Sequence, residues 1–532
     1  MERGRMLKIF NTLTGRKDPF EPLVPGQVRM YVCGVTVYDD SHLGHARSAI
    51  VFDVIRRYLE YRGYDVKFVK NFTDVDDKII NRAQELSLPW QAVTARYIDA
   101  YYRDMGRLGV CPATVEPKAT EHMEEIIRLI RTLVEKGVAY LVNGDIYFEV
   151  QKYPAYGRLS KRKLDELQAG ARVEVDERKH NPMDFALWKS SKPGEPAWPS
   201  PWGPGRPGWH IECSAMSMKH LGDTFDIHGG GQDLIFPHHE NEIAQSCSAT
   251  GKEFARYWVH NGFVQINQEK MSKSLGNFFT IREIFEKFPS SEPVTAEVIR
   301  YFLLSSHYRS PMDFSDQALK EAKRTLDGFY DLFLRLEESP RSEGGWDFTL
   351  TFEKRDKSDD LNKSDFAESL KRAENITAEE YVGRAIAQKH FYTLFRGVMD
   401  DDFDTPSAMA LFQVLRHVVN QLLSEKDLSR MSRDEIRNAF LSLGQVLGLF
   451  QVPVKDWVFG RKLHKVNLEA ELKPKGELAY IQMNPAIDQL VEERNEARRR
   501  KDFAKADAIR KKLEEQGIIL EDRPDGTTRW KR

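Results

Sequence analysis

A strand–helix–strand pattern near the amino terminus limits the fold more than any other feature of the sequence. Residues 28–37 are apolar and rich in β-branched side chains, a helix-like segment follows at 42–61, and a second strand-like run covers 65–72. Two strands joined through one helix at this spacing predict a βαβ unit and hence a parallel sheet. Such sheets bind ligands outside the carboxyl ends of their strands. We therefore expect an α/β protein with its ligand crevice near residues 33–45.

The 532-residue length predicts further domains around this unit, roughly three or four in total at about 100–200 residues each. Residues 74–108 and 119–136 have helical patterns, and 144–150 indicates a strand. Between 151 and 208 the chain passes from charged sequence into a stretch rich in Pro and Gly, which disfavours regular structure. We interpret this stretch as a module inserted into the α/β domain, whose pattern returns at 209–262.

The carboxyl-terminal part is mostly helical in pattern beyond about residue 320. Residues 354–374 contain six basic and six acidic residues with few apolar ones, which predicts a solvated insertion. Helical sequence resumes from 377 to about 450, and a final unit covers 476–532. In 493–512, nine Lys and Arg oppose four Asp and Glu, although the whole chain has a net charge of −2. This local excess suits contacts to nucleic-acid phosphates.

Composition excludes several classes of protein. The four cysteines, at 33, 111, 213 and 247, form no C-x-x-C pair and are too few for a disulfide scaffold of this size. We assign Cys111 and Cys247 to buried free thiols, the common fate of an isolated cysteine. No stretch reaches the ~18 apolar residues of a membrane helix, and no secretory apolar core follows the first residues. We expect a cytoplasmic protein with no membrane partner.

The segment His42-Leu43-Gly44-His45 opens the predicted helix directly after a strand. A helix N-terminus presents unpaired N–H groups and a partial positive charge, so it attracts phosphate, and Gly44 lets a nucleotide approach the backbone closely. Two imidazoles there could stabilise charge that builds on an α-phosphate under attack. The alternative is an ordinary capped helix with two surface histidines.

A second segment, Lys270-Met271-Ser272-Lys273-Ser274, lies in a predicted polar loop. Its two lysines could neutralise a triphosphate and hold the leaving pyrophosphate as charge develops. A solvated loop is the usual explanation for such a stretch. Together, H-x-G-H early and K-M-S-K-S late, around interrupted βαβ sequence, resemble the signature pair of class I aminoacyl-tRNA synthetases.

A third set of residues, Cys33, Cys213, His238 and Glu242, has the side chains that commonly hold zinc. His238 and Glu242 are four residues apart and would project from one face of a helix. Cys33 lies at the end of the first predicted strand, so in a parallel sheet it and Cys213 could converge on the crevice beside His42. Spacing alone leaves buried free thiols as the alternative.

Longer segments resemble the cysteinyl-tRNA synthetases over almost the whole chain. These segments are 31–38, 71–78, 208–214, 228–242, 260–264, 401–406 and 517–522. The resemblance implies a Rossmann-like parallel-sheet catalytic domain with an inserted module, followed by a mostly α-helical region and a small C-terminal domain. We place the parts at 1–116 (catalytic domain, first half), 117–207 (inserted connective module), 208–262 (catalytic domain, second half), 263–320 (stem-contact region with the K-M-S-K-S loop), 321–455 (helical bundle) and 456–532 (anticodon-binding domain).

The resemblance also implies a reaction and its cofactors. It predicts that ATP, with Mg²⁺, activates L-cysteine to cysteinyl-adenylate, and that cysteine then passes to the 3′ end of cysteine tRNA. One zinc per chain would be held by Cys33, Cys213, His238 and Glu242 and would take the substrate thiolate as a ligand. Zinc favours a thiolate over a serine hydroxyl, and such a site can discriminate by ~10⁴ or more without a second hydrolytic site.

By the same resemblance, residue roles can be carried onto this sequence. The expected catalytic residues are His42, His45, Lys270 and Lys273. The expected ATP-binding residues are His42, Gly44, His45, Gly230, Asp233, Val264 and Lys273. The expected amino-acid pocket is Gly34, Thr36, Thr73, Trp209 and His228. The alternatives are a core aromatic for Trp209 and a strand-end cap of the following turn for Thr73.

RNA recognition is expected in the C-terminal unit, in a protein that we expect to be a monomer. Residues 494–501 would contact phosphates, and Phe503 or Trp530 would stack on an anticodon base. A solvated amphipathic helix is the alternative, with Leu490, Ala497, Ala504, Ala508 and Leu513 on its buried side. Compared with the family, the insertion at 338–376 is long and residues 527–532 form an altered ending.

Two other functions are alternatives to this interpretation. A related ligase family uses the same adenylate chemistry but passes cysteine to an amino sugar, and it has no use for an anticodon-binding tail. The more distant alternative is a non-catalytic, zinc-containing RNA-binding protein that retains a synthetase body.

Overall fold

A computed structural model describes most of the chain. The described residues are 6–162, 178–266, 269–270, 279–337, 390–424, 430–459, 494, 497, 502–514, 519–522 and 528–531. They divide into two compact units, Met1–Lys462 and Leu463–Arg532. The predicted insertion at 338–376 and residues 271–274 of the K-M-S-K-S segment lie outside the described residues.

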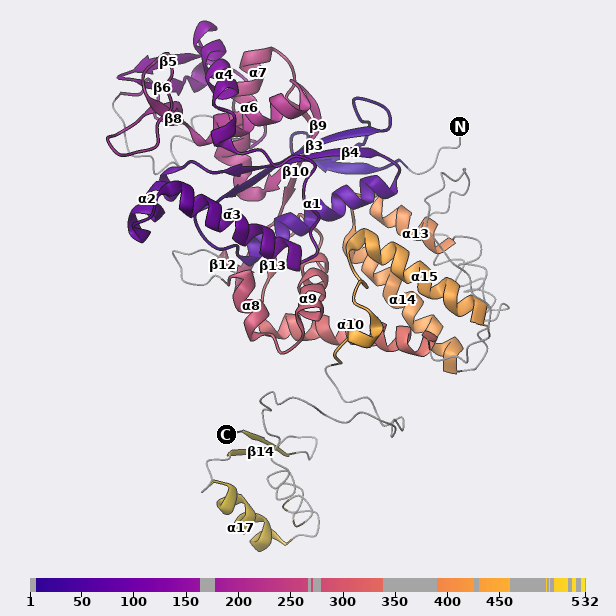
Figure 1. The fold of residues 1–532 in the computed structure, drawn as a ribbon. Coiled ribbons are helices and arrows are strands. Elements are labelled where there is room, and N and C mark those ends of the chain that lie inside the picture. The colour runs from indigo at the N-terminus through magenta and orange to yellow at the C-terminus, as the bar shows by residue number, and fades with distance from the viewer. Residues whose placement is uncertain are drawn as a thin grey trace. The chain divides into compact units, whose positions relative to one another are not determined.

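A four-stranded parallel sheet forms the centre of the first unit (Figure 1). Its strands, in the order β10-β9-β3-β4, are Ala255–Asn261, Phe225–Gly231, Gln27–Thr36 and Asp65–Thr73. Helix α1 (Leu43–Tyr61) connects β3 to β4, which confirms the predicted βαβ unit. The carboxyl ends of all four strands therefore lie along one edge of the sheet.

Alternate residues of β3 face two different cores, as expected for a central strand buried on both faces. Val28, Met30 and Val32 join the core that contains α1, while Tyr31 and Cys33 join the core that contains α6. The first core also takes in helix α3 (Trp90–Arg107) and the helical region, and the second takes in α4, α6 and α7 (Met123–Glu135, Trp209–Leu221 and Glu240–Thr250). Figure 1 shows α4, α6 and α7 on one side of the sheet and α1 on the other.

The helical prediction for 74–108 holds with one interruption. Helix α2 (Asp77–Leu86) ends at Ser87, which has a positive φ of 52°, and α3 begins after Pro89. The proline favours an extended backbone in the preceding residue, and this separates the two helices.

The inserted module is more regular than its composition predicts. Strands β5 (Ala139–Val142), β6 (Asp145–Phe148), β7 (Phe185–Ser190) and β8 (Gly205–Pro207) form an antiparallel sheet. Strands β7 and β8 flank the Pro- and Gly-rich stretch rather than lie within it, and the composition did not predict them. Burial stabilises β7, because Phe185, Leu187 and Trp188 contribute to the second core.

A small three-stranded sheet follows the central one. It has the order β12-β11-β13 and consists of Glu269–Lys270, Val264–Ile266 and Met312–Asp313. Between β12 and β13 run helices α8 (Ile281–Lys287) and α9 (Glu292–Leu304). A separate two-stranded pair, β1 (Lys8–Asn11) and β2 (Arg16–Pro19), lies at the start of the chain.

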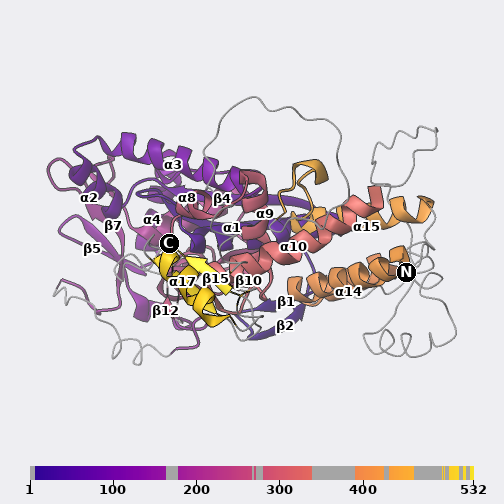
Figure 2. The ribbon, with the colours of Figure 1, turned by 90° about the horizontal axis from the view of Figure 1, so that it is seen from below.

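The helical region contains α10 (Asp316–Glu337), α13 (His390–Met399), α14 (Thr405–Ser424) and α15 (Arg430–Leu447). Figure 2 shows α10 running beside α14 and α15. Apolar residues of these helices share the first core with α1. No helix among the described residues is long and apolar enough to cross a membrane.

A buried ion pair joins this region to the catalytic domain. The guanidinium of Arg300 in α9 bonds the carboxylate of Asp53 in α1 and the carbonyl of Leu447 at the end of α15, the latter at 2.6 Å. Both members of the pair are 1% exposed. A charged side chain that is buried in this way destabilises the fold when its oppositely charged partner is removed.

We expect Asp53→Ala to lower the free energy of unfolding by about 3–5 kcal/mol, because it leaves Arg300 buried without its carboxylate. Urea unfolding followed by circular dichroism measures the change. Glu60→Ala is the matched control on the same helix, since its partially exposed pair with Arg56 contributes about 1 kcal/mol or less. Equal losses in the two variants would contradict the prediction.

The second unit contains helix α17 (Phe503–Glu514) and the antiparallel strands β14 (Ile519–Asp522) and β15 (Thr528–Lys531). Ala506, Ile509 and Leu513 form the buried side of α17. The prediction placed Ala508 on that side, but Ala508 is exposed. The helical repeat that contains Ile509 and Leu513 turns position 508 outward.

The basic stretch of this unit is partly confirmed as a surface. Lys505, Arg510, Lys511 and Lys512 are exposed. Arg494 is 3% exposed, so it does not present its charge to RNA as predicted. Residues 498–501 and the side chains of Phe503 and Trp530 lie outside the described part of the chain, so those predictions stay predictions.

Candidate functional site

Four side chains from distant parts of the sequence meet at the carboxyl edge of the central sheet. Cys33 comes from β3, Cys213 from α6, His238 from the turn before α7, and Glu242 from α7. One ligand atom from each lies within 4.8 Å of the others, and the four residues are 7%, 1%, 1% and 0% exposed. The predicted convergence of these residues is confirmed.

The local backbone explains how His238 and Glu242 share a face. His238 lies in a π-helical turn, Ile235–His239, that leads directly into α7. Its Nε2 atom is 3.0 Å from Oε1 of Glu242. The spacing of four residues therefore works as predicted, although His238 itself precedes the helix.

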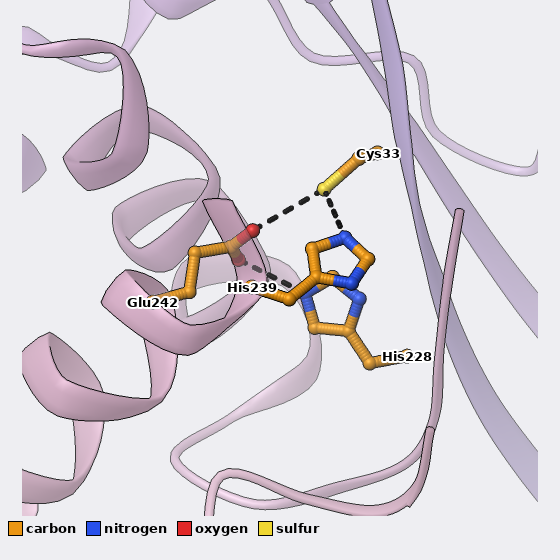
Figure 3. Close-up of side chains that lie close together, drawn as sticks. All are labelled: Cys33, His228, His239 and Glu242. Atoms are coloured by element: carbon orange, nitrogen blue, oxygen red, sulfur yellow. Dashed lines mark hydrogen bonds and ion pairs between the residues drawn. The ribbon is translucent and has the colours of Figure 1, made fainter. Parts of the chain in front are cut away.

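A second set of possible metal ligands overlaps the first and consists of Cys33, His228, His239 and Glu242. Figure 3 shows the imidazoles of His228 and His239 pointing toward the Cys33 thiol and the Glu242 carboxylate. Nε2 of His239 lies 3.3 Å from Sγ of Cys33, and Nε2 of His228 lies 2.9 Å from Oε2 of Glu242. The family resemblance assigns His228 to the amino-acid pocket and gives no role to His239. The only signal for His239 was its position next to His238.

A chain of hydrogen bonds extends from this cluster. Nδ1 of His239 lies 2.8 Å from Nε2 of His260, and Nδ1 of His260 lies 2.8 Å from Oγ1 of Thr12. Burial and the neighbouring His228 lower the pKa of His260 to about 3. This imidazole is therefore neutral at physiological pH, and its chain to Thr12 fixes the ring of His239 behind Cys33.

The electrostatics of the four-residue cluster favour a cation. Burial alone would raise the pKa of Glu242, but the neighbouring His228 and His238 lower it to about 2. A hydrogen bond with Cys33 lowers the pKa of Cys213 to about 6. Burial opposes a charge on His238, yet Glu242 and Cys213 raise its pKa to about 10. The buried carboxylate of Glu242 and the thiolate of Cys213 thus stabilise a positive charge placed next to them.

The donor set fits a zinc ion. Two sulfur atoms, one imidazole nitrogen and one carboxylate oxygen are typical tetrahedral zinc ligands, and all four are shielded from water. Burial and the bond to Cys213 raise the pKa of Cys33, so this thiol needs a cation beside it to ionise. Among the described residues, Nδ1 of His228 is buried without a hydrogen-bond partner.

The expected amino-acid pocket surrounds this cluster. Thr36 and Thr73 are paired neighbours at the ends of β3 and β4. The Gly34 amide donates to Oδ1 of Asn71 at 2.8 Å, and a side chain at Gly34 would lie 1.6 Å from the Asn71 carbonyl oxygen. This approach requires glycine. Asn71 in turn donates to Thr73 at 3.4 Å.

Trp209 belongs to the same pocket. Its side chain is 38% exposed, so the alternative of a core aromatic is wrong. Its ring centroid lies 4.2 Å from that of His238. The exposed indole therefore packs against His238, one of the four residues of the cluster.

The H-x-G-H segment forms the N-terminus of α1, as predicted. His42 is the N-cap, and its Nδ1 accepts from the Gly44 amide at 3.1 Å. Nδ1 of His45 accepts from the His42 amide at 3.2 Å, and the two rings stack with centroids 3.7 Å apart. The two imidazoles that cap the N-terminus of α1 are therefore the same two that are expected to bind phosphate. With Nδ1 as acceptor, each neutral ring carries its hydrogen on Nε2.

The remaining predicted ATP residues that the structure describes lie at the end of β9, follow it, or belong to the small three-stranded sheet. Gly230 is at the end of β9, Asp233 follows in the turn Gln232–Leu234, and Val264 begins β11. Lys270 ends β12, and Lys273 lies outside the described residues. Backbone bonds nevertheless fasten the far side of that segment to α1, because the Leu43 amide donates to the Phe279 carbonyl at 3.2 Å.

The other two cysteines differ from their prediction as buried thiols. Cys111 is exposed and Cys247 is half-buried. Cys111 follows α3 in a polar setting, where the guanidinium of Arg57 lies 3.0 Å from its sulfur. Neither belongs to a metal-binding cluster among the described residues.

Comparisons with known proteins agree along the whole chain. Residues 19–324 match the family described as tRNA synthetases class I (C) catalytic domain, residues 394–451 match the DALR domain, and residues 482–530 match the Cysteinyl-tRNA ligase anticodon binding domain. The curated Cysteine–tRNA ligases of Geobacter sulfurreducens and Geobacter metallireducens are 50% and 51% identical over 526 and 534 residues, which cover 99% of this chain and 99% of each relative.

A solved structure supports the fold separately. Methionyl-tRNA synthetase from Mycobacterium tuberculosis, in complex with methionyl-adenylate, matches with a TM-score of 0.52 over 79% of this chain and 89% of that chain. At 18% identity this likeness concerns the fold alone. The expected class, a Rossmann-like parallel-sheet domain followed by a helical region and a C-terminal domain, is confirmed.

Proposed function

The chain belongs to the cysteine–tRNA ligase family of class I aminoacyl-tRNA synthetases, and we propose that it selects cysteine through a zinc ion held by Cys33, Cys213, His238 and Glu242. As a member of this family, the enzyme uses ATP to join cysteine to its tRNA. The observation that carries the proposal is the cluster itself, two thiols, an imidazole and a carboxylate buried within 4.8 Å of one another. We expect one zinc per chain.

Zinc, when bound, accepts a substrate thiolate and discriminates against the serine hydroxyl, which ionises far less readily. The protein residues make this choice possible in two ways. Gly34, Thr36 and Thr73 would line the pocket beside the four residues that would hold the ion, and Trp209 packs against His238. Burial of the cluster keeps water from competing with the thiol.

The first chemical step needs little from the protein except charge stabilisation. The cysteine carboxylate is already ionised, so it attacks the α-phosphate of ATP without a general base, and pyrophosphate leaves. His42 and His45 donate from Nε2 to the phosphate oxygens. Their Nδ1 atoms accept backbone N–H groups, which supports this tautomer. The helix N-terminus adds its partial positive charge.

Two lysines complete the phosphate site. Lys270 and Lys273 neutralise the departing pyrophosphate, and Gly44, Gly230 and Val264 give the nucleotide close access to the backbone. Asp233 lies on the adenosine side. Mg²⁺ accompanies ATP. The position of Gly230 at the end of β9 and of His42 and Gly44 at the start of α1 supports their joint role.

The second step transfers cysteine from the adenylate to the terminal adenosine of cysteine tRNA. The C-terminal unit recognises the anticodon, with Lys505, Arg510 and Lys511 contacting phosphates. Their exposure on one short helix supports this assignment. We place the enzyme in the cytoplasm as a monomer.

Charging of unfractionated tRNA with labelled cysteine, with labelled serine as the control, tests the proposed function. Acid-stable cysteine counts on tRNA and none from serine are expected. A ligase that uses an amino sugar would give no charged tRNA, and a non-catalytic protein would also lack cysteine-dependent exchange of pyrophosphate into ATP. The match of 482–530 to an anticodon binding domain favours the tRNA enzyme over the amino-sugar ligase, and the intact H-x-G-H and K-M-S-K-S segments favour it over the non-catalytic protein.

A further inference from the structure

A buried arginine lies one turn into α1, two residues after His45. The side chain of Arg47 is 0% exposed, and among the described residues no carboxylate forms an ion pair with it. Its guanidinium instead donates to backbone carbonyls of two loops. The four acceptors are those of Phe263 (2.7 Å), His307 (3.3 Å), Tyr308 (3.4 Å) and Ser310 (2.5 Å).

This arrangement is costly if Arg47 only fills space. Burial lowers the pKa of Arg47 to about 10, which reflects the loss of hydration around its charge. An apolar side chain of similar volume would pack there without that penalty. A planar guanidinium, however, can hold several acceptors at fixed angles. Its use here indicates that the relative position of the two loops matters.

The two loops are locked together by further contacts. The amide of Gly262 donates to the Tyr308 carbonyl at 2.8 Å. A side chain at Gly262 would lie 2.5 Å from the Ser310 carbonyl oxygen. Arg47 therefore forms hydrogen bonds to two loops that are themselves bonded together. One loop leads into β11 and the other precedes β13, and we refer to them together as one compact unit.

That unit carries the second signature segment. Strand β11 pairs with β13 on one side, Val264 opposite Met312, and with β12 on the other, Gln265 opposite Lys270. Strand β11 itself contacts α1. Lys270 is the first residue of the K-M-S-K-S segment. One end of this segment is thus connected through β12 and β11 to the loop that Arg47 holds.

The described residues that follow the K-M-S-K-S segment contact the same helix. The amide of Leu43 donates to the Phe279 carbonyl at 3.2 Å, and the amide of Ile281 donates to the Ser41 carbonyl at 3.0 Å. Residues 279–281 are thereby fixed beside His42. Both ends of the segment are fastened to the start of α1, one by backbone pairing and the other through the Arg47 guanidinium.

We propose that Arg47 is a positioning residue that sets the distance between the histidines of α1 and Lys270, the first residue of the K-M-S-K-S segment. The proposal rests on the assignment of both signatures to ATP. Arg47 touches no reactant. A wrong distance affects the adenylate-forming transition state, in which charge develops on the pyrophosphate, whereas cysteine binding and transfer to tRNA do not use this lysine.

The test compares Arg47→Met with wild type in three measurements. We expect kcat for cysteine-dependent pyrophosphate exchange to fall about 100-fold, the scale for a catalytic group displaced by about 1 Å. The KM for cysteine, the zinc content, and single-turnover transfer from enzyme pre-loaded with cysteinyl-adenylate should stay within about twofold of wild type. Arg47→Lys keeps the charge with fewer donors and should recover part of the exchange rate.

Arg56→Met is the matched control, because this arginine of α1 bonds Glu60 and Pro112 instead of the two loops. It should exchange at the wild-type rate. Exchange within threefold of wild type in Arg47→Met would overturn the proposal, and so would equal losses in exchange and transfer. If Arg47→Met does not fold, the same split between exchange and transfer is measured in Arg47→Lys. Absent exchange in the wild type would instead overturn the proposed function.

Discussion

Cys213→Ser is expected to lose the metal and most of the selectivity for cysteine over serine. The substitution removes the thiol whose pKa lies near 6 in the cluster and leaves a hydroxyl that binds zinc poorly. If zinc supplies the discrimination, a factor of about 10⁴ between the two amino acids depends on this centre. Metal analysis of the purified protein and pyrophosphate exchange with each amino acid measure the two effects.

The matched control for this variant is Cys111→Ser. Cys111 is exposed and belongs to neither possible metal-ligand set, so its loss should change neither zinc content nor selectivity. If Cys213→Ser retains the zinc content of wild type, Cys213 is not a zinc ligand. Loss of zinc with unchanged selectivity would separate the metal from amino-acid choice and contradict the proposed function.

His45→Ala is expected to reduce kcat for cysteine-dependent pyrophosphate exchange by about 10²–10³, the usual effect of removing one donor to a developing charge. The substitution also removes the acceptor of the His42 amide and the ring that stacks on His42. Lys273→Ala should lose exchange to a similar extent through the leaving pyrophosphate. Steady-state exchange at saturating ATP measures both.

His180→Ala provides the control for loss of an imidazole. His180 stacks on Tyr140 in the inserted module, with ring centroids 3.8 Å apart, so its removal should leave exchange unchanged. Near-normal exchange in His45→Ala and Lys273→Ala would show that the two signature segments do not bind the phosphates. The zinc content of His45→Ala should remain that of wild type, which separates this effect from the metal centre.

Residue type predicts the βαβ unit of the central sheet, whereas the four proposed ligands follow from the family resemblance, because spacing alone left buried free thiols as the alternative. Runs of β-branched residues give β3 and β4, and thiol, imidazole and carboxylate are the side chains that zinc requires. The partners of Cys33 were less predictable. Neighbouring histidines such as His238 and His239 look alike in sequence, and only the turn that precedes α7 decides which side each ring faces.

The missed features depend on contacts that residue type does not encode. Arg47 resembles a surface arginine in sequence, and its four acceptors are backbone carbonyls, which every residue possesses. Strands β7 and β8 flank a segment whose composition favours loops, and burial of Leu187 and Trp188 stabilises β7. Cys111 was assigned to the interior because cysteine is usually buried, but it lies beside Arg57 at the surface.

The strand order β10-β9-β3-β4 has a consequence for synthesis of the chain on the ribosome. Strands β3 and β4 emerge first and can pair at once, but the other edge of β3 has no partner until β9 begins at Phe225, after the whole inserted module. An open edge of buried, apolar residues invites pairing with other chains. The antiparallel sheet of the module can close locally during this interval, whereas the proposed metal site, with residues on β3 and α7, can form only after α7 has been synthesised.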